Sequence, residues 1–206
     1  PMVPDIPGRE YAITSNDIFS LPALPERILV VGGGYIAVEF AGILHGFGAH
    51  VTQIYRRDLF LRGFDLDIRE TLRDEMLKQD IDLRFSLNLD RIEKTGDLLR
   101  CSLSNGSTLD MDAVLYATGR HPLSTDLGLE DVGVEMDAAG AIVVDSYSQT
   151  SVPGVHAIGD VTNRMNLTPV AIHEGMALAE TLFNDTPTAP DYSNVPTAVF
   201  SQPNCG

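Results

Sequence analysis

The sequence predicts an α/β fold, a Rossmann-like parallel sheet with a small antiparallel β-meander in three layers. Three observations lead to this prediction. An aliphatic run at 28–31 ends in three glycines and is followed at once by an apolar helical pattern. Strand and helix patterns then alternate to about residue 85, which implies a parallel sheet with right-handed crossovers. After that come short segments separated by turn residues, including the hairpin signal Asn-Gly at 105–106.

The expected elements follow in chain order. A proline-rich lead-in with a short helix near 15–20 precedes strand 27–32, helix 35–47, strand 50–55, helix 66–79 and strand 81–85. The meander takes 89–95, 98–103 and 107–110, and strand 112–117 follows it. In the loop-rich remainder we expect strands at 141–145 and 154–158, a helix from Thr168 to Phe183 and a strand starting at 196–201. Pro169 suits the first helical turn, where its missing N–H has no partner to lose.

The three glycines carry the strongest functional signal. Gly32, Gly34 and Ala37 fit the G-x-G-x-x-G/A spacing of a dinucleotide-binding turn. The first glycine permits the tight turn, the second lets the backbone approach a pyrophosphate, and Ala37 lets the helix lie close to its strand. The N–H groups of the first helical turn, aided by the helix dipole, then receive the phosphate charge.

The end of the second strand indicates which nicotinamide cofactor binds. An acidic residue about 20 positions after the glycine turn accepts hydrogen bonds from the ribose of NAD, whereas arginine accommodates the 2′-phosphate of NADP. No acid lies between His50 and Arg57, and Arg56, Arg57 and Arg62 cluster there. Their planar donor groups suit phosphate. The sequence favours NADP over NAD, and the alternative is a solvated, arginine-rich surface turn.

Composition narrows the function classes. The formal net charge of −15 argues against nucleic acid and anionic membranes as partners. No apolar run approaches the about 20 residues of a membrane span, and no signal peptide is visible. Cys101 and Cys205 lack a CxxC spacing, which is consistent with a reducing, cytoplasmic location. The histidines show no metal-ligand spacing.

Five ordered motifs, at 32–42, 55–62, 117–120, 156–161 and 167–171, resemble the pyridine nucleotide–disulfide oxidoreductase family, most closely its members that reduce glutathione disulfide. Such members also carry a first FAD turn, a redox Cys-x4-Cys and an interface domain with a catalytic histidine, none of which occurs here. We therefore expect a fragment. The resemblance implies a lead-in from the FAD domain at 1–22, an NADP-binding domain at 23–121, a central FAD-domain segment at 122–190 and the start of an interface domain at 191–206.

The resemblance also implies individual roles. Tyr35 resembles the tyrosine that gates the nicotinamide pocket, and Glu39 the acid that pairs with a lysine beside the flavin; these two are the expected catalytic residues. Without the resemblance, Glu39 reads equally well as a solvent-facing residue at the helix edge. The implied cofactor-binding residues are Gly32, Gly34, Tyr35, Ile36, Ala37, Glu39, Arg56, Arg57, Arg62, Thr118, Gly119, Asp160, Leu167 and Thr168.

Three of these belong to the flavin. Asp160 matches the aspartate that binds the FAD ribityl chain, although the residue alone reads as an ordinary turn or cap. Leu167 and Thr168 match residues at a helix N-terminus facing the flavin pyrimidine, where the positive helix end stabilises negative charge. Arg56 and Arg62 match the 2′-phosphate ligands, whereas Arg57 occupies a position that varies in the family.

The implied activity is transfer of a hydride from NADPH to FAD, whose electrons then reduce a cysteine pair outside this chain and finally glutathione disulfide, in a protein that is a homodimer at full length. Another disulfide reductase, such as one acting on trypanothione, is the nearest alternative. A nucleotide-binding module without turnover is an alternative from a different class.

Overall fold

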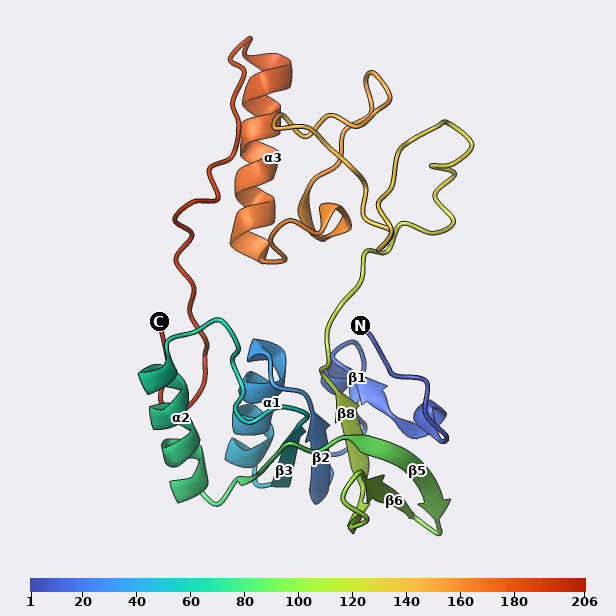
Figure 1. Cartoon of the computed structure of the whole chain (residues 1–206), viewed down its shortest axis with the longest axis vertical. Coiled ribbons are helices and arrows are strands. Elements are labelled where there is room, and N and C mark those ends of the chain that lie inside the picture. Colours follow the sequence, from blue (N-terminus) through green and yellow to red (C-terminus); the bar gives the residue numbers. More distant parts are fainter. The chain divides into compact units, whose positions relative to one another are not determined.

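The structure is a computed structural model that describes all 206 residues, and it divides into two compact units (Figure 1). The first unit consists of Pro1–Gly119 together with Pro196–Gly206, and the second consists of Arg120–Val195. The chain therefore leaves the first unit and later returns to it. The domain boundaries implied by the family resemblance stay a prediction.

A five-stranded parallel sheet forms the centre of the first unit. Its strands are β1 (Ile13–Thr14), β2 (Arg27–Val31), β3 (His50–Tyr55), β4 (Asp82–Phe85) and β8 (Ala113–Tyr116), in the order β1-β8-β2-β3-β4. β2 lies in the middle, with Val30 level with Gln53 of β3 and Leu115 of β8. The predicted parallel sheet is confirmed, and the glycine turn follows one of its central strands.

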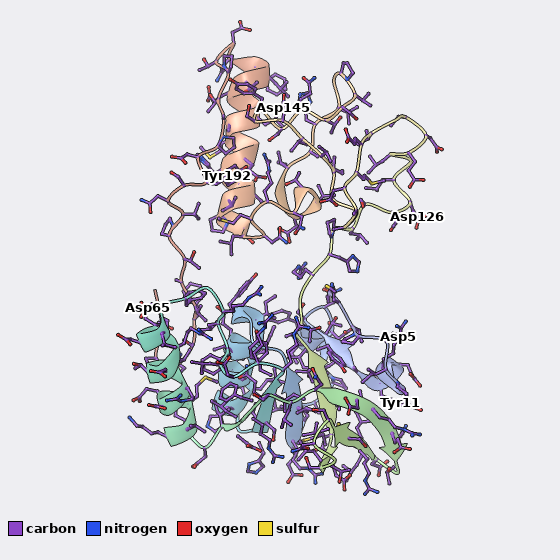
Figure 2. All side chains as sticks on the ribbon, viewed as in Figure 1. Asp5, Tyr11, Asp65, Asp126, Asp145 and Tyr192 are labelled. Atoms are coloured by element: carbon purple, nitrogen blue, oxygen red, sulfur yellow. The ribbon has the colours of Figure 1, made fainter.

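Two helices cover one face of this sheet. They are α1 (Tyr35–Gly46), which starts directly after the glycines, and α2 (Leu66–Lys78). α2 begins at Asp65, labelled in Figure 2, whose carboxylate accepts a hydrogen bond from the N–H of Asp67 at 2.9 Å. Buried side chains of both helices pack on alternate residues of the strands, namely Val38, Leu44, Leu72 and Met76 against Ile28, Val30 and Leu115.

The meander covers the other face. β5 (Leu89–Thr95), β6 (Leu98–Leu103) and β7 (Thr108–Met111) form an antiparallel sheet in that order. Its inner side chains, including Ile92 and Cys101, share a second core with Leu29, Ile54 and Tyr116 of the parallel sheet. Figure 1 shows α1 and α2 on one side of β2 and the meander on the other. The predicted three-layer arrangement is confirmed.

The second unit contains only two helical elements. They are the short 3-10 helix η3 (Gly159–Thr162) and α3 (Thr168–Phe183), which has the predicted bounds. A small core of Val134, Ile142 and Ala157 lies under its loops. No helix of the structure has the length and apolarity needed to cross a membrane.

Several local predictions are wrong. The segments 141–145, 154–158 and 196–201 form only isolated bridges, Met136 to Ile142, Gln149 to His156 and Val199 to Cys205 among them, because no neighbour runs beside them for several residues. The short helix expected near 15–20 is present as the 3-10 helix η2 (Ile18–Ser20), whereas the 3-10 helix η1 (Arg9–Tyr11) and the edge strand β1 were not expected.

Candidate dinucleotide-binding site

The first glycine of the turn is required by the backbone around it. Gly32 has φ +152°, and a Cβ atom there would lie 2.3 Å from the carbonyl oxygen of Ala117 at the end of β8. The same Cβ would lie 3.1 Å from the Cβ of Ala37, which is fully buried on α1. Gly32 therefore allows the close approach of β2, β8 and α1, and Ala37 lets the helix reach it.

The other two glycines differ in what surrounds them. A Cβ on Gly33 would lie 2.5 Å from the ring of Tyr55, the last residue of β3, whereas a Cβ on Gly34 would meet nothing within 4 Å. Gly34 is the N-cap of α1 and offers no side-chain acceptor. No side chain therefore fills the space beside Gly34. This leaves room for a pyrophosphate to approach the N–H groups of Ile36 and Ala37 in the first turn of α1.

A cavity of about 240 Å³ opens beside this turn. Gly34, Tyr35 and Arg62 line it from the glycine turn and the loop after β3. The full lining is Gly33, Gly34, Tyr35, Tyr55, Leu61, Arg62 and Phe64. An aromatic wall, an open glycine backbone and a guanidinium group are the contacts that a dinucleotide with an extra phosphate needs, so the residues present fit NADP(H).

The loop after β3 is attached directly to the glycine turn. The N–H of Leu61 donates to the carbonyl of Gly33 at 2.7 Å, and Leu61 is 1% exposed with φ +52°. On its other side, the guanidinium group of Arg69 on α2 donates to the carbonyls of Leu59 at 2.8 Å and Phe60 at 2.7 Å. These bonds set the position of Arg62 at the cavity.

The arginine cluster stands apart electrostatically. Nine of the fourteen Lys and Arg side chains pair with a carboxylate, and Arg69 bonds to carbonyls. The four left without such partners are Lys94 and the cluster Arg56, Arg57 and Arg62, all exposed. In a chain of net charge −15, three neighbouring arginines without a carboxylate form a locally positive surface suited to an anion.

Tyr35 and Glu39 lie one turn apart on α1. Tyr35 is 37% exposed and lines the cavity. Glu39 is half-buried, and its Oε1 accepts a hydrogen bond from the N–H of Phe200 at 2.9 Å, so it holds the returning segment on α1. This contact departs from the solvent-facing alternative for Glu39. The pairing with a flavin-side lysine stays a prediction.

Thr118 and Gly119 follow β8 and contact the N-terminal segment. The hydroxyl of Thr118 donates to the carbonyl of Met2 at 2.9 Å, and the N–H of Met2 donates to the carbonyl of Gly119 at 2.8 Å. Their cofactor contacts stay a prediction.

The residues assigned to the flavin lie in the second unit. Asp160 is exposed in the first turn of η3, 3.6 Å from the Nε of Arg120. Leu167 is the N-cap of α3 without a side-chain hydrogen bond, and Thr168 is exposed in the first turn. An exposed carboxylate and a helix N-terminus without a side-chain cap are polar groups of the kind that the ribityl and pyrimidine parts of FAD need.

Sequence reasoning missed a buried ionic cluster in this unit. Glu174 of α3 is 1% exposed; its carboxylate accepts from the N–H of Gly159 at 2.5 Å and the hydroxyl of Tyr192 at 2.7 Å, and lies 3.3 Å from Arg164. Burial, together with the hydrogen bond to Glu174, raises the pKa of Tyr192 to about 12. Figure 2 labels Tyr192 beside α3. The cluster fixes Gly159, the residue before Asp160.

The cavity is also lined by residues that the sequence reasoning did not select, namely Gly33, Tyr55, Leu61 and Phe64. Arg69, which holds the adjoining loop from outside the cavity, was missed as well. The glycine triplet was a usable signal for Gly33. Nothing in the sequence distinguishes Arg69 from the other charged residues of α2, because its role depends on two backbone carbonyls.

Known proteins are similar to this chain over most of its length. The family model described as "Pyridine nucleotide-disulphide oxidoreductase" matches residues 1–175. The chain is 52% identical over 203 residues to a glutathione reductase from Burkholderia cepacia, covering 98% of this chain and 45% of that protein. It is 44% identical to a trypanothione reductase from Trypanosoma congolense, covering all of this chain and 43% of the relative. The chain thus spans less than half the length of these relatives.

A solved structure is similar over the same extent. The HOCl-induced flavoprotein disulfide reductase RclA from Escherichia coli matches with a TM-score of 0.93 at 30% identity, over 99% of this chain and 48% of that one.

Proposed function

Because the chain belongs to the pyridine nucleotide–disulfide oxidoreductase family, we propose that it forms the NADPH-binding part of a flavoprotein that reduces glutathione disulfide. The observation that carries the nucleotide assignment is the cluster of Arg56, Arg57 and Arg62 without carboxylate partners. It lies at the end of β3, with Arg62 on the wall of the cavity at the glycine turn. Guanidinium groups bind phosphate through charge and a planar donor fork.

The chain's own residues have the following proposed roles. Gly34 and the N–H groups of Ile36 and Ala37 bind the pyrophosphate, and Arg56 and Arg62 bind the 2′-phosphate, with Arg57 adding charge. Tyr35 covers the nicotinamide pocket and moves aside for the cofactor, and Glu39 positions the nicotinamide end. The pyridine nucleotide and the flavin supply the hydride chemistry when bound.

In the second unit the proposed roles concern the flavin. Asp160 accepts hydrogen bonds from the ribityl chain of FAD, and the N-terminus of α3 at Leu167 and Thr168 faces the flavin pyrimidine. A positive helix end there favours negative charge on that ring. Glu174 supports Asp160 by holding the preceding N–H of Gly159.

The disulfide substrate rests on the relatives. Identity of 52% to a glutathione reductase favours glutathione disulfide. The 44% identity to a trypanothione reductase makes trypanothione disulfide the second candidate.

Calorimetric titration of the chain with NADPH and NADH tests the nucleotide assignment. Arg56→Ala and Arg62→Ala should each weaken NADPH binding by about 1.5–3 kcal/mol, the range for hydrogen bonds to charged groups, and leave NADH binding nearly unchanged. Lys94→Ala, which removes the fourth cation without a carboxylate partner, in β5 of the meander, is the matched control. Equal losses for both cofactors would remove the 2′-phosphate assignment.

A further inference from the structure

Arg69 occupies an unusual position for an arginine of this chain. It lies in the first turns of α2 and is half-buried, but its guanidinium group pairs with no carboxylate. Its Nε donates to the carbonyl of Phe60 and one terminal nitrogen donates to the carbonyl of Leu59. The planar fork thus bridges two consecutive carbonyls of one loop, a geometry that the single ammonium group of lysine does not reproduce.

The loop that Arg69 holds carries the predicted phosphate ligand Arg62. Leu59 and Phe60 are 6% and 0% exposed, so their carbonyls have little access to water and need a donor from the protein. The ring of Phe60 packs edge-on against Phe85, with centroids 5.7 Å apart. Leu61 then bonds to Gly33 of the glycine turn. Arg69, the core and the glycine turn therefore fix the loop at three successive residues immediately before Arg62.

We propose that Arg69 is a positioning residue for 2′-phosphate recognition, which holds the loop at Leu59 and Phe60 so that Arg62 is preorganised at the cavity. The inference rests on the proposed NADPH function. Arg69 is absent from the cavity lining, and its Nε and one terminal nitrogen donate to carbonyls of the loop, so it acts through the loop. Preorganisation increases affinity because less ordering is needed on binding.

The experiment compares two probes that differ only in the relevant group, adenosine 2′,5′-bisphosphate and adenosine 5′-monophosphate. Dissociation constants are measured by calorimetry for the 206-residue chain and for Arg69→Lys, with Arg69→Gln as a second variant that keeps a planar donor but loses the fork. Arg73→Lys is the matched control, since it lies one turn further along α2 in a surface pair with Asp74. Hydrogen exchange at residues 59–62 reports on the loop.

The wild-type chain should prefer the bisphosphate, and Arg69→Lys should reduce that preference by about three- to tenfold, the equivalent of reordering one flexible side chain. Affinity for the monophosphate should be unchanged, the amide of Leu61 should exchange faster, and Arg73→Lys should behave as wild type. A role in stability alone would weaken both probes equally, and that result overturns the inference.

The same measurements distinguish failure of the inference from failure of the proposed function. Retained preference in both Arg69 variants, beside a loss of preference in Arg62→Ala, overturns the positioning role and leaves the NADPH assignment standing. Equal affinity of the wild-type chain for the two probes refutes the NADPH assignment, and the inference falls with it.

Discussion

Alanine at each of the three glycines of the turn should separate folding from nucleotide binding. Gly33→Ala places a Cβ atom 2.5 Å from the ring of Tyr55, so the ring must leave its position at the end of β3. Overpacking of this kind destabilises by about 1–3 kcal/mol. Gly34→Ala meets nothing within 4 Å, and Gly34 has φ −86°, which any residue adopts. Its effect on stability should stay within about 0.5 kcal/mol.

Gly34→Ala should instead weaken NADPH binding, although it leaves the stability of the chain nearly unchanged. The open backbone at this position is where a pyrophosphate approaches, so a methyl group there should remove hydrogen bonds to a charged group and weaken NADPH binding by about 1.5–3 kcal/mol. Gly32→Ala brings a Cβ to 2.3 Å from the backbone carbonyl of Ala117, which cannot rotate away. We expect that variant to lose about 3 kcal/mol or more of stability.

Labelling of Cys101 in increasing urea measures this stability, because Cys101 is buried in the first unit. Calorimetry with NADPH measures binding. Equal destabilisation by Gly33→Ala and Gly34→Ala would refute the steric reasoning. A Gly34→Ala chain that binds NADPH as tightly as wild type would refute the assignment of the pyrophosphate to this turn.

Three further predictions concern buried groups. Burial, with a smaller effect of Asp110, raises the pKa of Cys101 to about 12, so a thiol reagent at neutral pH should label Cys205 alone in the native chain and both cysteines after denaturation. Burial likewise raises the pKa of Tyr116 to about 12. In the unfolded chain the same thiol and phenol ionise at lower pH. The free energy of unfolding should therefore keep its full value below about pH 9 and fall as pH rises toward about 12, less steeply in Cys101→Val. Urea midpoints measured at increasing pH check this. Glu174→Leu should destabilise the second unit by about 3–5 kcal/mol, because it leaves the charge of Arg164 unpaired, and circular dichroism during urea unfolding measures the loss.

Periodicity predicted the central part of the fold because each element there has a long, regular pattern. Strand 50–55 and helix Thr168–Phe183 have the predicted bounds. The edge strand β1 was missed, since its two residues, Ile13 and Thr14, form no pattern and depend on pairing with β8. The reverse error occurred at 141–145, where aliphatic residues imitate a strand but no extended neighbour pairs with them.

The residues of the candidate site also separate into those that the sequence selects and those whose roles only the structure reveals. Gly32, Gly34 and the arginine cluster were selected by local spacing alone, and their contacts with a cofactor stay a prediction. Arg69 and Glu174 act on backbone groups far along the chain or in another element, and their roles require coordinates. For Glu39, the sequence predicted its position on the helix but not its hydrogen bond with the N–H of Phe200.

The discontinuity of the first unit has a consequence for biosynthesis. Val199 is fully buried in the core beneath α1 and α2, and Glu39 and Gln79 hold the same returning segment through Phe200 and Gln202. During translation, residues 1–119 emerge first but lack this part of their core until the ribosome has also made 120–195. The nascent first unit is therefore incompletely packed while the second unit is synthesised, and contacts of such long sequence separation form slowly. A chaperone that acts on this protein would meet it at that stage, with the surface under Val199 still exposed.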